Sequence, residues 1–392
     1  MSFNICFSPP LRGGGEPTLK RSLSLALITF YGLGNILGAG IYVLIGKVAE
    51  HAGYQTPLSF LLASLLAGFT AFSYAELSVR YPLSAGEVVY VEKGVGLRWL
   101  AILVGVLIIM TGIVSAATIA RGFVGYLQVF VDFPGVWAIV LLVLALGVLS
   151  AWGIAESAGV AAMISLLEVA GLLLIIWVTQ PSVDAAVQTL HNLSQGVDGG
   201  GAVGLFLGAF LAFYAFIGFE DMVNVAEEVR DPGRDLPRAI LLALGVSTLL
   251  YFLLTFATVS TTSPAALAAS DAPLAYVYHV VTGSDPWVTA ISLVAVVNGA
   301  LIQIIMSSRV CYGMSRRGWA PEWLGRVHPL TRTPLIATVL VTVLVMLMAP
   351  WIPIESLARA TSFFILMVFT LVNLALWRIK RRPRNAHGLR GV

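Results

Sequence analysis

Charged residues are scarce in this sequence. They make up 11% of its 392 residues, whereas 58% are hydrophobic. A domain that folds in water carries a charged coat of roughly a quarter of its residues, so the composition excludes most soluble enzymes and nucleic-acid-binding proteins. The mean hydropathy of +0.90 points the same way. We therefore expect the chain to fold within a lipid bilayer and to have no nucleic acid as a partner.

Cysteine and histidine are also rare. The two cysteines, Cys6 and Cys311, make no disulfide framework, and the five histidines show no metal-ligand spacing. An enzyme inside the membrane would need a nucleophile, a metal set or paired acids at one depth, and no apolar run offers them. We accordingly expect no catalytic residue, no metal and no cofactor.

Apolar runs of helix length recur along the chain and predict about ten membrane-spanning helices. They lie at residues 23–46, 57–78, 99–120, 135–152, 158–179, 201–222, 239–261, 287–307, 334–352 and 357–377. The first run follows no basic segment and precedes no small-residue cleavage site, so we expect it to stay in the mature protein as a span.

The lysines and arginines are distributed unevenly over the predicted loops. When successive loops are assigned to alternate sides, all 23 fall on one side except Lys47, Arg121 and Arg359. Because positively charged loops resist translocation, that side is expected to be cytoplasmic. The sequence thus predicts a multi-pass protein of the cell membrane with both termini inside.

The first predicted span contains Gly32, Gly34, Gly38 and Gly40 in the middle of the membrane. Two interpretations fit this segment. Gly34 and Gly38 form a GxxxG pair, which allows close helix packing. Alternatively, Gly38 and Gly40 let the helix unwind where it lines a cavity, because glycine lacks the Cβ atom that restrains the backbone.

The sixth predicted span has an aromatic run before Gly218, which is followed by Glu220 and Asp221. Ionisable groups at this depth are costly on a lipid-facing surface. Interrupted helices at matching places in two halves of five spans indicate an inverted-repeat transporter. Free N–H groups of one half-helix suit a carboxylate, and free carbonyls of another suit an ammonium, so the pattern predicts a site for the zwitterionic end of an amino acid.

Several motifs, in order along the chain, resemble the amino acid permeases of the amino acid/polyamine/organocation superfamily. The resemblance runs from about residue 19 to residue 378. The motifs are Gly38–Tyr42, Tyr74–Leu77, Tyr81–Glu87, Ala226–Pro232, Arg234–Ile240 and Ser308–Pro321, with Val327–Pro329 and Thr333–Pro334 beyond them.

This resemblance implies an all-α polytopic membrane protein with a fold like that of the bacterial leucine transporter. Such a fold is a 5+5 inverted repeat of about ten transmembrane helices, of which helices 1 and 6 are broken. It divides the chain into a cytoplasmic segment 1–18, one transporter domain 19–378 with repeats at about 19–180 and 201–378, and a basic cytoplasmic tail 379–392. Most members have twelve spans, so ten spans leave the oligomer contacts open. Cys6 and Cys311 are both expected on the cytoplasmic side, which argues against a disulfide-linked heavy chain.

The resemblance also implies a set of substrate-binding residues. Amides of the first span would hold the substrate carboxylate, and carbonyls of the sixth span would hold its ammonium, with Tyr214 closing over the site. The apolar side chains of the sixth span favour a neutral amino acid. The expected residues are Ile36, Gly38, Ala39, Gly40, Phe213, Tyr214, Ala215, Phe216, Ile217 and Gly218.

Glu168 is an isolated acid in the fifth predicted span, with apolar neighbours on both sides. An acid in such a place is either satisfied by a neighbouring helix for structural reasons or functional. Some relatives are thought to place there a lysine whose ammonium stands in for a sodium ion, and a glutamate can instead carry a proton. We expect Glu168 to couple transport to protons, with Asn298 of the eighth span as its polar partner. Glu220 resembles a family carboxylate linked to protons and gating.

The sequence thus predicts a secondary active transporter that moves neutral amino acids by alternating access, coupled to protons. A transporter or exchanger of cationic amino acids or polyamines stays open, as does a channel or receptor. The charged residues after the sixth span form either a solvated inner loop or an inner-gate network that breaks on opening. They are Glu227, Glu228, Arg230, Asp231, Arg234 and Asp235.

Overall fold

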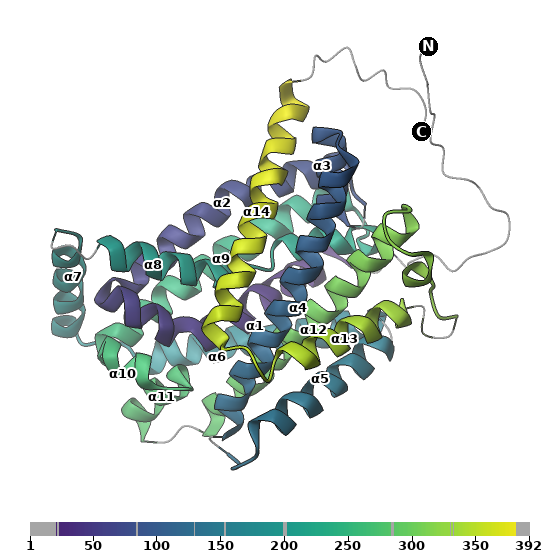
Figure 1. Ribbon diagram of the computed structural model, residues 1–392. Helices are drawn as coiled ribbons and strands as arrows, with labels where there is room; N and C mark the ends of the chain where they lie inside the picture. The colour runs from purple at the N-terminus through teal and green to yellow at the C-terminus, as the bar shows by residue number, and fades with distance from the viewer. Residues whose placement is uncertain are drawn as a thin grey trace, which may run out of the picture.

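The computed structural model describes residues 21–381 except 22, 84, 129, 153, 199–201, 284–285, 330 and 332. The expected cytoplasmic segment 1–18, with Cys6, lies outside the described residues, as do residues 382–392 of the expected tail 379–392 and the side chain of Ala39. The described part is almost entirely helical (Figure 1), and its one extended pairing is a single bridge between Leu23 and Val229.

Each of the predicted spans coincides with an α-helix except the sixth, which coincides with a shorter α-helix and the 3₁₀ segments after it. Nine stretches of the described residues are long and apolar enough to cross a membrane, and α13 is a shorter apolar helix of 14 residues. In the first half they are α1 (Leu25–Ala52), α2 (Thr56–Arg80), α4 (Arg98–Gln128), α5 (Gly135–Trp152) and α6 (Ile154–Val178). In the second half they are α8 (Ala202–Phe213) with the 3₁₀ segments η2 (Tyr214–Phe216) and η3 (Glu220–Glu228), then α9 (Pro232–Thr261), α12 (Pro286–Arg316), α13 (Leu335–Met348) and α14 (Ile354–Arg381).

Short helices that the sequence did not predict show how the halves are related. Helix α3 (Gly86–Val95) follows the second spanning helix of the first half, while α10 (Pro264–Ala269) and α11 (Pro273–Thr282) follow the corresponding helix of the second half. Figure 1 shows α3 and the α10–α11 pair at opposite ends of the bundle. Equivalent elements at opposite ends are what two inverted repeats require. Helix α7 (Val183–Asp198) lies between the halves, to one side of the bundle.

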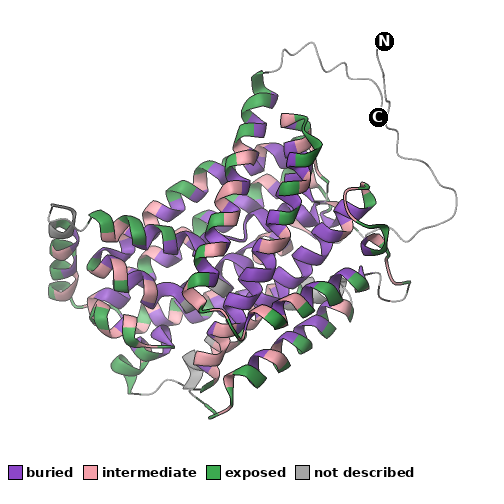
Figure 2. Ribbon diagram, in the orientation of Figure 1, coloured by how far each residue is buried: buried purple, intermediate pink, exposed green. Residues whose placement is uncertain are grey.

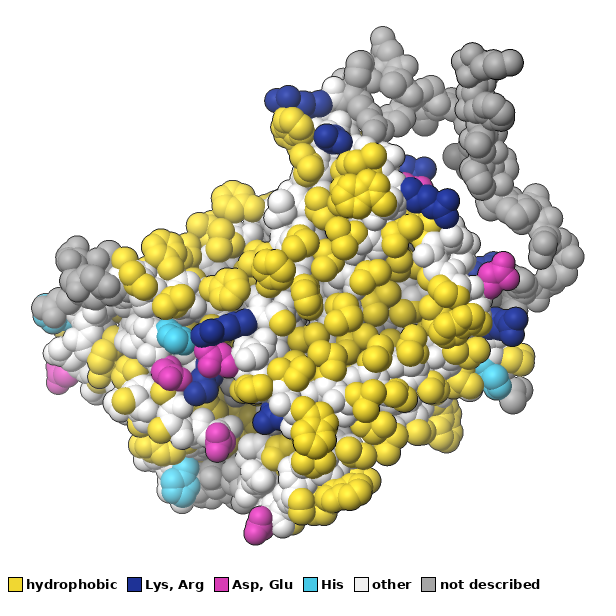
Figure 3. All heavy atoms as spheres, viewed as in Figure 1, with side chains coloured by type: hydrophobic (Ala, Val, Ile, Leu, Met, Phe, Trp, Pro, Cys, Tyr) yellow, Lys and Arg dark blue, Asp and Glu magenta, His cyan; other side chains and the backbone are white. Residues whose placement is uncertain are grey.

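The outer surface of the bundle is apolar over most of its height. Phe69, Phe72, Trp152 and Met163 are each more than 60% exposed. Figure 2 shows buried residues concentrated along the inner helices, and Figure 3 shows a broad field of apolar side chains with the charged ones gathered toward the two ends. A surface of this kind suits hydrocarbon and not water.

Charged contacts mark the two ends of the bundle. At the end that carries α3, Glu76 pairs with both Arg80 and Lys380. At the end that carries α11, Lys47 and Arg121 line one cavity, and Arg359 pairs with Glu355. The three basic residues that the sequence set apart therefore lie together at the α11 end, as the alternation of loops requires.

The predicted break in the first span is wrong for this conformation. Helix α1 is helical from Leu25 to Ala52 across its glycines. The reason is that these glycines serve close packing: a Cβ atom at Gly40 would lie 2.0 Å from the Ala215 Cα atom, and one at Gly38 would lie 2.8 Å from the Ala295 carbonyl oxygen. Glycine permits unwinding but also permits contact between backbones, and here α1 keeps its own hydrogen bonds.

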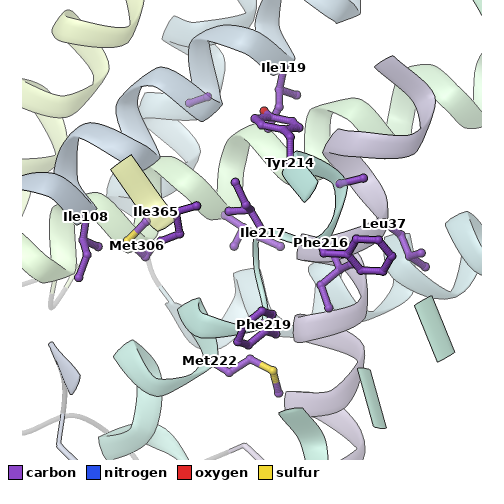
Figure 4. Packing of buried hydrophobic residues seen from close by; sticks show 14 of the residues in the cluster. Leu37, Ile108, Ile119, Tyr214, Phe216, Ile217, Phe219, Met222, Met306 and Ile365 are labelled. Carbon is purple, nitrogen blue, oxygen red and sulfur yellow. The ribbon is translucent and has the colours of Figure 1, made fainter. Parts of the chain in front are cut away.

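The predicted break in the sixth span is confirmed. Helix α8 ends at Phe213, η2 follows, and Ile217 is extended with φ −65° and ψ 132°. Gly218 has φ 134°, a backbone conformation that a side chain would strain. In Figure 4 Ile217 lies on the extended stretch between Tyr214 and Phe219. Backbone groups of this stretch are thus released from helical pairing inside the bundle.

Candidate functional site

The interruption after α8 lies against the middle of α1. Gly40 contacts Ala215 closely, and the Tyr251 hydroxyl of α9 joins the two elements because it can donate to the carbonyl of Ile36 (2.6 Å) or of Ala215 (3.0 Å). On the other side of Gly218, the Asn35 side-chain amide donates to the Gly218 carbonyl at 3.0 Å. The structure therefore brings together the two segments that the sequence selected for the substrate.

Aromatic side chains surround this junction. The Phe216 ring lies edge-on to Tyr251 with centroids 5.1 Å apart, and Phe213 meets Phe369 of α14 at 5.9 Å. The Tyr214 hydroxyl is 3.0 Å from that of Ser115 on α4. Phe213, Tyr214 and Phe216 are all buried, so these aromatic residues form an apolar layer beside the interruption of the helix.

Glu168 lies where α6 meets α1 and α12. Its side chain is fully buried, and Asn298 donates its amide N–H to Oε1 at 3.0 Å, as the sequence predicted. The same Oε1 lies 3.4 Å from the place where a Cβ atom would stand on Gly38. The other carboxyl oxygen, Oε2, and the Asn298 amide oxygen have no hydrogen-bond partner among the described residues. The Glu168–Asn298 pair thus has two acceptor oxygens without a partner and lacks a hydrogen-bond donor for them.

A second buried polar cluster joins α1, η3 and α12. Gln303 donates to Asp221 at 2.8 Å and to the Asn35 side-chain oxygen at 3.2 Å, and Asn35 also donates to Asp221. The sequence analysis noted Asp221 but missed Asn35 and Gln303. Both are polar residues within apolar spans, which was the available signal, but their spacing along the chain does not show that they meet.

Glu220 caps the interruption itself. Its carboxylate accepts the Gly218 backbone N–H at 2.8 Å, and the acids Asp221 and Glu87 interact with it electrostatically. No described contact links it to Glu168. The predicted coupling residues therefore divide into a Glu168–Asn298 pair and a separate acid at the interruption.

The α3 end of the bundle is closed by contacts around η3. Leu23 donates its N–H to the Glu228 carbonyl at 3.0 Å and accepts from the Arg230 N–H at 2.9 Å. The Glu228 carboxylate lies 3.9 Å from Arg309 Nε, and both side chains are buried. Of the charged residues expected in an inner gate, Glu228 alone is buried, whereas Arg230, Asp231 and Arg234 are exposed.

The opposite end is hollow. A cavity of about 440 Å³ lies between α1, α4 and the α10–α11 connection, and its lining includes Lys47, Arg121, Gln128 and Asp271. The Arg121 guanidinium donates to the carbonyls of Ala349 (3.1 Å) and Pro350 (2.9 Å), which fixes its position beside the cavity. The part of the chain that the structure describes has no group of three or more His, Cys, Asp or Glu that could hold a metal ion.

Comparison with known proteins agrees with this arrangement. The family model described as "Amino acid permease" matches residues 23–390. The branched-chain amino acid permease BcaP of Bacillus subtilis is 30% identical over 94% of this chain and 83% of its own length. Cationic amino acid transporter 4, vacuolar, of Arabidopsis thaliana is 28% identical over 95% of this chain and 65% of its own.

Among solved structures, the fold is similar to that of a Na⁺-coupled sialic acid symporter in a substrate-bound outward-open state. The TM-score is 0.66 at 14% identity, with 92% of this chain and 80% of the other covered. This likeness shows the leucine-transporter-like fold. Together with the family match over nearly the whole chain, it identifies the protein as a membrane transporter and not an enzyme, and the chain belongs to the amino acid permease family of the amino acid/polyamine/organocation superfamily.

Proposed function

We propose that this permease is a secondary active transporter that carries a neutral amino acid together with a proton. The observation that carries the proposal is the buried Glu168–Asn298 pair beside Gly38, because an acid with an amide partner can gain or lose a proton without leaving a cation unpaired. The similarity to a branched-chain amino acid permease supports a neutral substrate.

The substrate site proposed is the junction of α1 with the interruption after α8. The apolar layer of Phe213, Phe216 and Ile217 suits an apolar side chain, and the carbonyls released around η2 suit an ammonium. The substrate carboxylate would take amides near Gly38 and Gly40. These amides lie within a continuous helix in this conformation, so binding would require α1 to open there, at a cost that glycine keeps low.

The state of the two ends supports alternating access. The α11 end holds the cavity of about 440 Å³, while the α3 end is sealed by the Leu23–Val229 bridge and the Glu228–Arg309 pair. Transport would close the α11 end and open the α3 end by moving α1 and the interrupted helix against the rest of the bundle. We propose that the α3 end, rich in arginine and lysine, faces the cytoplasm of a cell whose plasma membrane holds the protein.

Protonated Glu168 would supply the donor that the pair lacks. Its hydroxyl can point at the free Asn298 oxygen while the Asn298 N–H keeps its bond to Oε1. Loss of the proton restores a buried negative charge, which is costly in the apolar surroundings of α6. Proton binding and the closed packing of α1 on Gly38 are thereby expected to favour each other.

The test uses purified protein in proteoliposomes with an imposed pH gradient. Glu168→Gln imitates the protonated acid and cannot release a proton, so it should keep substrate binding and exchange but lose uphill uptake. Glu50→Gln, which removes an exposed carboxylate paired with Lys47, should accumulate substrate as the wild type does. Strict sodium dependence of the wild type would overturn proton coupling, and full accumulation by Glu168→Gln would move the role to Glu220.

The similarity to a cationic amino acid transporter favours one second candidate, a carrier of cationic amino acids or polyamines. A thermal-shift screen of the twenty amino acids and common polyamines separates the two. A ligand at a hundred times its dissociation constant stabilises the folded state by about 2.7 kcal/mol if it does not bind the unfolded chain. Stabilisation by leucine, isoleucine or valine supports the proposal, and stabilisation by arginine, lysine or a polyamine alone refutes it.

A further inference from the structure

Glu87, in the first turn of α3, is a buried acid that the proposed transport mechanism does not use. Its side chain is fully buried, although α3 lies outside the candidate spans. It faces η3, where Asn224 donates its amide N–H to Glu87 Oε1 at 3.4 Å. At the neighbouring Gly86, a Cβ atom would lie 2.8 Å from the Val223 side chain. The start of α3 is therefore packed tightly on the inner half of the interrupted helix.

The two side chains hold more acceptors than donors. Glu87 Oε2 and the Asn224 amide oxygen are both buried, and neither has a hydrogen-bond partner among the described residues. Two orphaned acceptors cannot pair with each other unless a hydrogen is placed between them, and a buried acceptor without a partner costs about 1–3 kcal/mol. A proton on Glu87 supplies that hydrogen: Oε2–H donates to the Asn224 oxygen while the Asn224 N–H donates to Oε1.

The charges around Glu87 oppose ionisation. The acid that acts on it most is Asp221 on η3, and Glu220 on the same segment also interacts with it. The phenols of Tyr74 on α2 and Tyr90 on α3 are neutral neighbours. Of the cations on adjoining elements, Arg309 of α12 pairs with Glu228, Lys380 of α14 pairs with Glu76, and Arg98 of α4 donates to the Gly318 carbonyl. Lys93 on α3 is exposed.

These surroundings act on the pKa of Glu87. The pKa of Glu87 is raised from 4.5 to about 8. Burial is the largest cause, and the charge of Asp221 adds to the increase. The backbone N–H of Glu87 and the Asn224 amide favour the anion and offset part of the increase. Ionisation thus falls within the range of pH that a cell can present on its two sides.

Other contacts hold α3 to the remainder of the bundle. A Cβ atom at Gly94 would lie 2.5 Å from the Ala375 Cα atom, so the far end of α3 is fixed on α14. The turn that leads into α3 places Ala85 at φ 56°, a left-handed conformation that is strained for alanine, with Gly313 of α12 close beside it. Glu87 therefore stands on an anchored helix, while Asn224 stands on the segment that transport must move.

We propose that Glu87 is a second protonation site, whose protonated carboxyl pairs with Asn224 and latches the inner half of the interrupted helix to α3. Loss of this proton breaks the Glu87–Asn224 latch, leaves an anion facing Asp221 and releases η3. The inference rests on the proposed function only in that η3 is taken as a moving part of a transporter.

The sign of the pH dependence follows from linkage. The latched state raises the pKa of Glu87, so latching is complete below the unlatched value of 4.5, weakens as pH rises toward about 8 and changes no further above it. Between those limits the ratio of open to latched protein should rise by up to about tenfold per pH unit.

The experiment measures how fast an impermeant maleimide labels Val225→Cys, a buried position on η3, in a protein with Cys6→Ser and Cys311→Ser. Rates are expressed relative to Glu87→Gln at each pH, which cancels the ionisation of the reporter thiol. A glutamine at position 87 can exchange both hydrogen bonds with Asn224, so it should stay latched and label slowly at every pH. The relative rate of the wild-type latch should rise from pH 5.5 to about 8 and then level off.

Matched variants keep the result unambiguous. Glu92→Gln, also on α3 and partly exposed, should behave as the wild type does, and Asn224→Leu should label fast even at pH 6. Glu168→Gln keeps Glu87 and should still label faster as pH rises, so that this test can succeed where proton-driven uptake fails. A wild-type profile parallel to that of Glu87→Gln overturns the latch. If Glu87→Gln does not fold, slow labelling of Asn224→Leu at pH 6 overturns it equally.

Discussion

Gly40 offers the sharpest test of how α1 packs. In a helix open to solvent, glycine is about 0.5–1 kcal/mol less stable than alanine, so Gly→Ala should normally help. At Gly40 the added methyl carbon would lie 2.0 Å from the Ala215 Cα atom, 2.3 Å from its Cβ atom and 2.9 Å from its nitrogen. These are mostly backbone atoms that cannot rotate away, and the overlap far exceeds what a few tenths of an ångström could relieve.

Gly40→Ala should therefore destabilise the protein by about 1–3 kcal/mol, the cost of overpacking, and separate α1 from the interruption after α8. Gly68→Ala on α2 is the matched control, since nothing lies within 4 Å of a Cβ atom there, and it should be neutral or slightly stabilising. Thermal unfolding in detergent and uptake by proteoliposomes measure the two effects. Close packing at Gly40 is refuted if Gly40→Ala unfolds at the same temperature as Gly68→Ala and transports at the wild-type rate.

Two further predictions concern buried polar groups. Asp221→Leu leaves the Asn35 and Gln303 amides without their shared acceptor, so unfolding in denaturant should show a loss of about 1–3 kcal/mol for each unpaired group, while Asp221→Asn should lose less. Arg309→Met leaves the Glu228 carboxylate buried without its cation and should lower the free energy of unfolding by about 3–5 kcal/mol. The double variant with Glu228→Met should recover most of this loss. A double variant as unstable as Arg309→Met would show that the ion pair is not the cause.

The spans and the sixth-span break could be predicted because each depends on local properties. Length and hydropathy alone mark a helix that crosses the membrane. Gly218 sits between an aromatic run and two acids, and a backbone at φ 134° needs glycine. The first span was different, since Gly38 and Gly40 permit unwinding and close packing alike. The choice between them depends on Ala215 and Ala295, residues far away in the sequence that nothing local identifies.

The same limit applies to the polar contacts. Asn298 could be named as the partner of Glu168 because its amide can accept from the protonated acid or donate to the ionised one. Gln303 lies only five positions further along α12, yet it meets Asn35 and Asp221 instead. Five residues turn a helix by about 140° beyond one full turn, so neighbours in sequence face different partners. Packing decides which neighbouring helix a residue faces. The sequence of one chain predicts the depth of a residue in the membrane far better than the helix it faces.

The buried acids differ in the kind of partner that each one has. Glu228 has Arg309 beside it, and removal of a proton there leaves a pair of opposite charges. Glu168 and Glu87 each have an asparagine, and no lysine or arginine among the described residues lies within ion-pair range of either. An amide is neutral and can serve as donor or acceptor, so it accommodates both protonation states, whereas a guanidinium favours the anion alone. The kind of partner therefore distinguishes the two proposed proton sites, Glu168 and Glu87, from the Glu228–Arg309 ion pair.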